Sequence, residues 1–235
     1  MIVSHAHRFI FLRTEETGGT TLIAALKAAC AAGDTYPGQI RPAWSRRLPF
    51  SYGTLQRAAP DIFGLHPLAT ARQARRVLGP RIFDNYFKFA IERNPWERQV
   101  AVHARREWRR GREDANFDRD MKSPVYRSRE NCRLDNWSIY AVGDEIVVDR
   151  IVRYETMAAD MAEIGRLLGL ELDERATRPR TAGPRRPHYS LYYSDTTRDM
   201  VARWYWREIQ AFGYRFEDRR GGRRTGTTIR LQPST

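Results

Sequence analysis

The residues of this chain that could most readily do chemistry are Thr-Gly-Gly-Thr-Thr at positions 17–21. They follow an apolar run with strand character at 9–12 and precede an Ala- and Leu-rich segment with helical spacing. A strand that enters a helix through adjacent glycines presents unpaired N–H groups at the positive end of the helix dipole, which suits phosphate or sulfate. The glycines allow the backbone to approach an anion, and Thr20 and Thr21 add hydroxyl donors.

An ordinary strand–turn–helix corner would explain the same pattern. The Gly-Gly-Thr sequence alone leaves an anion site and a plain corner equally open. The Walker A spacing, Gly-x-x-x-x-Gly-Lys followed by Ser or Thr, is absent. The interpretation of the loop therefore depends on the rest of the chain.

The loop and three later stretches resemble one known family. Residues 11–22 (Phe-Leu-Arg-Thr-Glu-Glu-Thr-Gly-Gly-Thr-Thr-Leu) are similar to the 5′-phosphosulfate loop of sulfotransferases that use 3′-phosphoadenosine 5′-phosphosulfate (PAPS), in the branch with carbohydrate and small bacterial enzymes. Residues 87–98 resemble the family's 3′-phosphate segment, a strand ending in Arg-Asn-Pro-x-x-Arg. Residues 148–155 resemble its strand-to-helix corner and 189–216 its closing helix, so the resemblance covers 8–216 in the family's order.

The resemblance implies transfer of a sulfuryl group from PAPS to a hydroxyl or amine of a saccharide or small-molecule acceptor. The product would be 3′-phosphoadenosine 5′-phosphate (PAP), and no metal is expected. The implied cofactor-binding residues lie in the loop, the 3′-phosphate segment and its helix, and a basic loop near residue 185: Arg13, Thr17, Gly18, Gly19, Thr20, Thr21, Arg93, Ala101, Arg185 and Arg186.

Two positions depart from the family pattern. Glu16 stands where the family has the loop lysine, and Ala101 stands where it usually has a serine. A carboxylate about 4 Å from the donor's charges would repel them by about 4 kcal/mol at an effective dielectric of about 20, nearly a thousandfold in rate or affinity. The sequence does not distinguish a Glu16 that turns away, one that Arg13 neutralises, and a natural or engineered variant with impaired transfer.

His66 and Arg93 each have two interpretations. His66 ends a short apolar run before a helical stretch that starts at Pro67, and its pKa range suits a general base for an acceptor hydroxyl. The resembling family often has a histidine with that role at a comparable point, but a structural histidine that caps the helix or faces solvent also fits. Arg93 follows a predicted buried strand and could grip the 3′-phosphate in a bidentate manner, or it could pair with a nearby carboxylate.

Composition favours an acidic partner and a reducing compartment. The 235 residues carry a net charge of +13, almost entirely from arginine, and include two cysteines. No apolar run is long enough to span a membrane and no signal peptide is visible, so we expect a cytoplasmic protein. A catalytically silent relative that binds a nucleotide or anionic partner is the main alternative to an enzyme. Nucleic-acid binding is disfavoured because no reader motif is present. The oligomeric state is not indicated.

The order of predicted strands and helices around these residues indicates a three-layer α/β domain. We expect a mainly parallel sheet of four or five strands, helices on both faces, and the cofactor at the carboxyl ends of the first strands. The sequence predicts a buried parallel strand over 86–92 and a helix end followed by a solvated loop over 104–133. It also predicts one helix over 196–212, capped by Ser194-Asp195. The predicted domain covers residues 1–217, and the basic residues 218–235 form a tail expected to be disordered.

Overall fold

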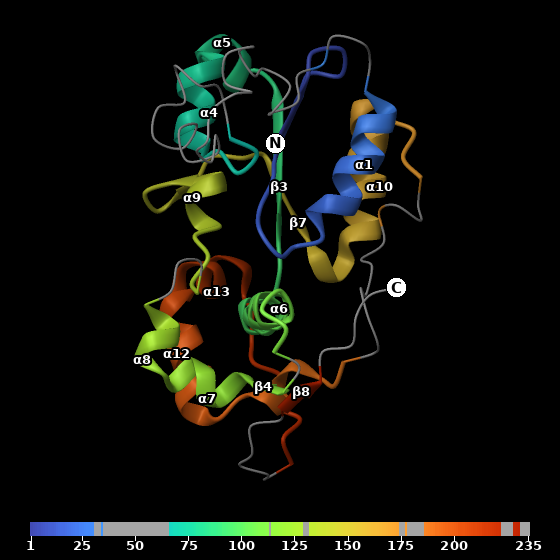
Figure 1. Cartoon of the computed structure of the whole chain (residues 1–235). Helices are drawn as coiled ribbons and strands as arrows, with labels where there is room; N and C mark the ends of the chain where they lie inside the picture. Colours follow the sequence, from blue (N-terminus) through green and yellow to red (C-terminus); the bar gives the residue numbers. More distant parts are fainter. Residues whose placement is uncertain are drawn as a thin grey trace, which may run out of the picture. The chain divides into compact units, whose positions relative to one another are not determined.

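A computed structural model describes residues 1–30, 34, 66–112, 114–128, 132–173, 177, 186–221 and 228–230. The chain divides into two compact units, each of which is described by itself. Unit 1 comprises Met1–Glu92 and Asp135–Pro179, and unit 2 comprises Arg93–Leu134 and Arg180–Thr235. Figure 1 shows the chain and labels elements of each unit.

Unit 1 contains a four-stranded sheet in the order β1-β2-β3-β7. The strands are β1 (Ile2–Ser4), β2 (Phe9–Leu12), β3 (Phe87–Glu92) and β7 (Arg150–Arg153). β1 pairs antiparallel with β2, whereas β2, β3 and β7 pair in parallel. The predicted mainly parallel sheet is therefore confirmed.

Two helices cover one face of this sheet. They are α1 (Gly19–Ala29) and α10 (Met157–Leu168), which lie side by side in Figure 1. Alternate strand residues project toward them because successive side chains of a strand point to opposite faces. The resulting apolar cluster joins strand, α1 and α10 residues: Ile2, Phe9, Phe11, Leu22, Leu26, Phe89, Ile91, Val152, Met157, Met161, Ile164 and Leu170.

The other described elements of unit 1 are short. They are α4 (Ala71–Leu78), α5 (Pro80–Phe83), α9 (Trp137–Tyr140), the strands β5 (Ala141–Val142) and β6 (Glu145–Ile146), and the 3₁₀ turn η2 (Tyr154–Thr156). The N-terminus of α4 is fixed by reciprocal hydrogen bonds between Thr70 and Gln73. Gly143, with φ of 65°, lies between β5 and β6.

Unit 2 is mainly helical. Its elements are α6 (Pro95–Trp108), β4 (Asp114–Asn116), α7 (Phe117–Lys122), α8 (Pro124–Arg127), η3 (Tyr189–Tyr192), α12 (Asp195–Trp204), α13 (Trp206–Phe212) and β8 (Thr228–Arg230). The expected solvated loop over 104–133 is wrong for α7 and α8. Phe117, Met121 and Tyr126 anchor both helices in the core of unit 2, and Asn116 and Ser123 cap them.

The helix expected over 196–212 is interrupted at Tyr205, which separates α12 from α13. Its hydroxyl donates to Gln99 Oε1 at 2.8 Å and accepts from the Leu134 N–H at 3.1 Å. The Arg98 guanidinium lies 4.5 Å from the centre of the Tyr205 ring. These buried contacts hold Tyr205 in a non-helical conformation. The interruption could not be predicted, because residues 196–212 contain no glycine or proline.

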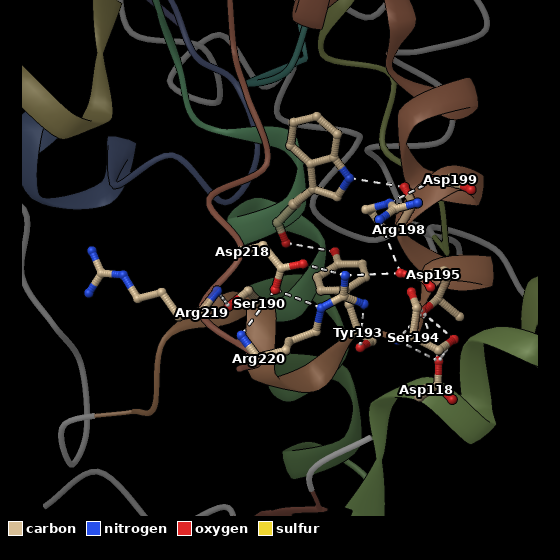
Figure 2. Close-up of polar contacts among 12 residues, drawn as sticks. Asp118, Ser190, Tyr193, Ser194, Asp195, Arg198, Asp199, Asp218, Arg219 and Arg220 are labelled. Carbon is tan, nitrogen blue, oxygen red and sulfur yellow. Dashed lines mark hydrogen bonds and ion pairs between the residues drawn. The ribbon is translucent and has the colours of Figure 1, made fainter. Parts of the chain in front are cut away.

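Asp118 of α7 holds the N-terminus of α12 by hydrogen bonds to Ser194, its N-cap, and to Thr197. Asp118 Oδ1 accepts a hydrogen bond from Ser194 Oγ at 2.5 Å (Figure 2). It also accepts one from Thr197 Oγ1 at 2.7 Å, while Lys122 Nζ lies 2.6 Å from Oδ2. Burial is the largest influence and raises the pKa of Asp118, but the hydrogen bonds from Lys122, Ser194 and Thr197 together outweigh it, so the pKa lies below its usual value. Ser194 therefore lies at the predicted cap position, and its hydroxyl donates a hydrogen bond to the Asp118 carboxylate.

Part of the predicted tail has defined partners in unit 2. Figure 2 shows Arg220 between two carboxylates, 2.9 Å from Asp195 and 2.6 Å from Asp218. The Arg219 N–H donates to Ser190 Oγ at 3.1 Å. Farther along, β8 pairs antiparallel with β4. Within the described residues, no helix combines the length and the apolar character needed to cross a bilayer.

Candidate functional site

The connection between β2 and α1 ends in a helix N-terminus that no side chain caps. Gly18 is the N-cap of α1 with φ of 78° and ψ of 5°, no side chain caps the helix, and its first turn contains no acidic residue. The first N–H groups of a helix have no acceptor within the helix. The N-terminus of α1 therefore presents backbone donors and a positive dipole end that no carboxylate of its first turn offsets.

Gly18 is required by both conformation and space. Its φ of +78° lies in the left-handed region, which side chains other than glycine rarely adopt. A Cβ atom there would lie 3.0 Å from a ring carbon of Tyr154 and 3.1 Å from the terminal methyl of Met157. A side chain at this position would therefore force Tyr154 and Met157 to shift by a few tenths of an ångström.

Two buried threonines attach the loop to the central strand β3. Thr14 Oγ1 donates to the carbonyl oxygen of Ile91 at 2.5 Å and lies 2.7 Å from Thr17 Oγ1. Thr17 is wholly buried, so its hydroxyl is part of the loop interior. The Thr17 hydroxyl stabilises the loop by its contact with Thr14. Any contact of Thr17 with a ligand would therefore come from its backbone.

Arg13 and Glu16 bracket the inner part of the loop. Arg13 Nη2 donates to Thr20 Oγ1 at 3.3 Å, which aligns a cation with an exposed hydroxyl at the start of α1. Glu16 has φ of 57°, a left-handed conformation that costs about 1 kcal/mol or more for a residue with a Cβ. The half-exposed Glu16 therefore occupies a strained backbone position one residue before Thr17.

Sequence reasoning missed Asn136, which holds the other side of the loop. Its Nδ2 donates to the Glu15 carbonyl oxygen at 3.0 Å, and its Oδ1 accepts from the Glu15 N–H at 3.0 Å. Asn136 is 1% exposed. No local signal marks it, because the two residues are 121 positions apart in the chain.

The structure places His66 in the turn before α4 and not at its cap, because the helix begins at Ala71 rather than at Pro67 and Thr70 is its N-cap. His66 Nδ1 accepts a hydrogen bond from the Leu68 N–H at 3.0 Å, in the turn that leads to α4. In the neutral ring that acceptor role leaves the proton on Nε2. A general-base role for His66 stays a prediction, and it would require Nδ1 to give up Leu68.

The predicted 3′-phosphate residues belong to unit 2. Arg93 Nη2 lies 2.8 Å from Glu97 Oε1, which is the carboxylate pairing that the sequence left open. Ala101 is half-buried in α6, and Arg186 is exposed. Arg185 lies outside the described residues, and the side chain of Thr21 is not described. The contacts of Arg93 and Arg186 with a phosphate stay predictions.

A Ser–His–Glu arrangement in unit 2 resembles a hydrolytic triad only in its residue types. His188 Nδ1 lies 2.9 Å from Ser190 Oγ, and His188 Nε2 lies 3.5 Å from Glu217. Ser190 is 0% exposed, and His188 is the N-cap of η3. These contacts cap η3 and attach residue 217, and they leave Ser190 no access to a substrate. No group of three metal-ligating side chains occurs among the described residues.

Comparison with known proteins shows that this chain is similar to an archaeal protein. No family model matches the chain, and no solved structure does. An uncharacterised protein of Archaeoglobus fulgidus is 31% identical over 108 residues, which cover 43% of this chain and 84% of that protein. At this identity and coverage, the chain belongs to the same family as that A. fulgidus protein, whose name assigns no activity.

Proposed function

We propose that the protein binds the sulfated end of PAPS at residues 13–21 and transfers the sulfuryl group to a hydroxyl or amine of a saccharide or small-molecule acceptor. The observation that carries the proposal is the N-terminus of α1, which follows a parallel strand, begins at a left-handed glycine and has no side-chain cap. We also propose that unit 1 has a three-layer fold with a P-loop-like binding loop. This part of the proposal is supported by the resemblance of residues 8–216 to sulfotransferases.

Sulfuryl transfer loads negative charge onto the oxygen that bridges the phosphate and the sulfate. Backbone N–H groups aimed at that oxygen stabilise the transition state without reorganisation. The N–H groups of Gly18, Gly19 and Thr20 would serve that purpose, and the Arg13–Thr20 hydrogen bond of 3.3 Å supplies a guanidinium beside them. The acceptor's proton would pass to His66 if that residue exchanges its Leu68 contact for the substrate.

The ribose phosphate would be held by Arg93. That guanidinium is 2.8 Å from Glu97, so a phosphate must share it with a carboxylate or displace the carboxylate. Ala101 provides no hydroxyl, and a hydrogen bond to a charged group is worth about 1.5–3 kcal/mol. We therefore expect weaker nucleotide binding than a serine at this position would allow.

Glu16 is the feature that decides between an active enzyme and a silent relative. Its charge opposes the donor's negative charge, and it replaces the cation that the resembling family uses at this point. The catalytically silent relative, which keeps the loop to bind a nucleotide or an anionic partner, is the second candidate because of this one residue.

Transfer of radiolabelled sulfate from PAPS to a panel of saccharide and phenol acceptors tests the proposal. Glu16→Lys should raise transfer by tenfold or more, up to about a thousandfold. Glu15→Lys is the matched control, since it makes the same charge change at the adjacent position and should change transfer far less.

Each outcome is assigned to one candidate. A gain confined to Glu16→Lys supports the sulfotransferase. Nucleotide binding without transfer in either protein supports the silent relative. Absence of both binding and transfer, in the wild type and in Glu16→Lys, contradicts both candidates.

A further inference from the structure

Asn136 forms an unusual pairing with the backbone of the candidate site. Its amide contacts both polar groups of Glu15, donating to the carbonyl oxygen and accepting from the N–H, each at 3.0 Å. Only a side chain with a donor and an acceptor on one planar group can make this pair, which reproduces the way two strands bond. A buried side-chain amide of this kind is costly to leave unpaired.

Asn136 is itself held firmly. It is 1% exposed and immediately precedes α9, in which Trp137 donates from Nε1 to the Gly143 carbonyl oxygen at 2.7 Å. Tyr140, at the other end of α9, is fully buried. The amide is thus presented from a fixed element, which is what a positioning residue requires.

The pairing fixes the loop at the position where its conformation becomes strained. Glu15 is followed by Glu16, with φ of 57°, and then by Thr17 and Gly18, with φ of 78°. On the other side, Thr14 is attached to the Ile91 carbonyl oxygen. The loop is therefore tied to β3 through Thr14 and to the α9 segment through Glu15, and the left-handed residues that lead into α1 begin directly after these two attachments.

We propose that Asn136 is the positioning residue that holds residues 14–18 in the anion-binding conformation, acting through the Glu15 backbone without touching the ligand. The inference rests on the proposed function for the identity of the ligand. Its consequence is preorganisation: the N–H groups at the start of α1 are aimed before the nucleotide arrives, so binding does not have to order the loop.

The test compares Asn136→Ala with Tyr140→Phe in the full chain. Tyr140 is buried in the same segment but its hydroxyl contacts Glu92, so its variant controls for lost stability. Asn136→Ala should weaken PAP binding at least tenfold in calorimetry and speed hydrogen exchange of the amides of residues 14–18. Tyr140→Phe should leave the PAP dissociation constant within about twofold.

Asn136→Asp adds a readout that a purely structural role would not produce. The ionised carboxylate can accept from the Glu15 N–H but has no proton for the Glu15 carbonyl, whereas the protonated acid has the donor and acceptor of the original amide. Its PAP affinity relative to wild type should therefore recover as the pH is lowered from about 7 to about 5, because a carboxyl group buried beside a carbonyl has a raised pKa.

Equal losses of PAP affinity in Asn136→Ala and Tyr140→Phe, or unchanged exchange of residues 14–18 in Asn136→Ala, would overturn the inference. Failure of the proposed function looks different. In that case the wild type does not bind PAP, while the exchange of residues 14–18 in Asn136→Ala still shows whether Asn136 holds the loop.

Discussion

The hydroxyl of Tyr140 donates a 2.8 Å hydrogen bond to the Glu92 carboxylate, and both side chains are fully buried. Glu92 is the last residue of β3, so this bond satisfies a buried carboxyl oxygen at the carboxyl end of the central sheet. Burying a carboxylate is tolerated only when its oxygens have hydrogen-bonding partners.

Tyr140→Phe removes one of those partners and should lower the free energy of unfolding by about 1–3 kcal/mol. Urea denaturation measures the change. The double variant with Glu92→Gln should recover part of the loss, because a neutral amide costs less to bury. An unchanged midpoint in Tyr140→Phe would show that the bond contributes nothing.

Gly18→Ala should destabilise unit 1 more than an alanine at another left-handed glycine. The new Cβ meets Tyr154 at 3.0 Å and Met157 at 3.1 Å, whereas a Cβ at Gly143, with a similar φ of +65°, has nothing within 4 Å. Gly143→Ala therefore isolates the backbone cost of about 1–2 kcal/mol, and Gly18→Ala should exceed it by at least about 1 kcal/mol. Thermal or urea unfolding compares the two, and equal losses would refute the close approach.

Arg93→Ala should reduce the preference for PAP over adenosine 5′-phosphate, which lacks the 3′-phosphate. Loss of a charged hydrogen bond of about 1.5–3 kcal/mol corresponds to a loss of roughly tenfold or more in the affinity ratio. Glu97→Gln removes the carboxylate 2.8 Å from Arg93 and should raise the ratio instead. Calorimetry with both nucleotides gives the ratio, and an unchanged ratio in Arg93→Ala removes Arg93 from the site.

The stability of the protein should fall as the pH drops below about 6.5 because of His103 in unit 2. Burial lowers the pKa of His103 from 6.5, and Asp120, whose Oδ2 lies 3.0 Å from Nε2, and Glu107 oppose that effect only in part, while the Arg112 charge adds to it. The unfolded chain therefore binds the proton more readily, so this contribution is complete above pH 6.5 and is lost as the pH falls toward the folded-state pKa.

His103→Gln retains a donor for Asp120 but cannot titrate. Between about pH 7 and pH 5, the unfolding free energy of this variant should change less with pH than that of the wild type. The two slopes should differ by up to about 1.4 kcal/mol per pH unit. Urea titrations at several pH values measure both slopes. Parallel slopes would exclude His103 as the source.

The sheet and its helices were predictable where local signals agreed with tertiary packing. The run of residues in β2 is wholly buried, which its apolar sequence indicated, and Met157, Met161 and Ile164 form the core-facing stripe of α10. α7 and α8 were not predictable, because helices of six and four residues depend on packing rather than on propensity. The apolar residues that anchor them, Phe117, Met121 and Tyr126, are separated mostly by charged and polar residues, so they form no clear pattern in the sequence.

The candidate site was predictable only as far as its backbone. Adjacent glycines after an apolar strand indicated the turn, and the structure shows Gly18 in the left-handed conformation that the turn needs. Asn136 could not be found, because its pairing with Glu15 depends on how α9 packs against the loop and leaves no periodicity in the sequence. The inward orientation of Thr17 likewise depends on Thr14 and the Ile91 carbonyl.

Calorimetric titration of the full chain with PAP shows whether the turn before α1 binds the nucleotide. We predict saturable binding with a dissociation constant below about 1 mM, weakened at least tenfold by Gly18→Ala and strengthened by Glu16→Lys. If neither the wild type nor Glu16→Lys binds PAP at millimolar concentration, the N-terminus of α1 is not a nucleotide site and the account is contradicted.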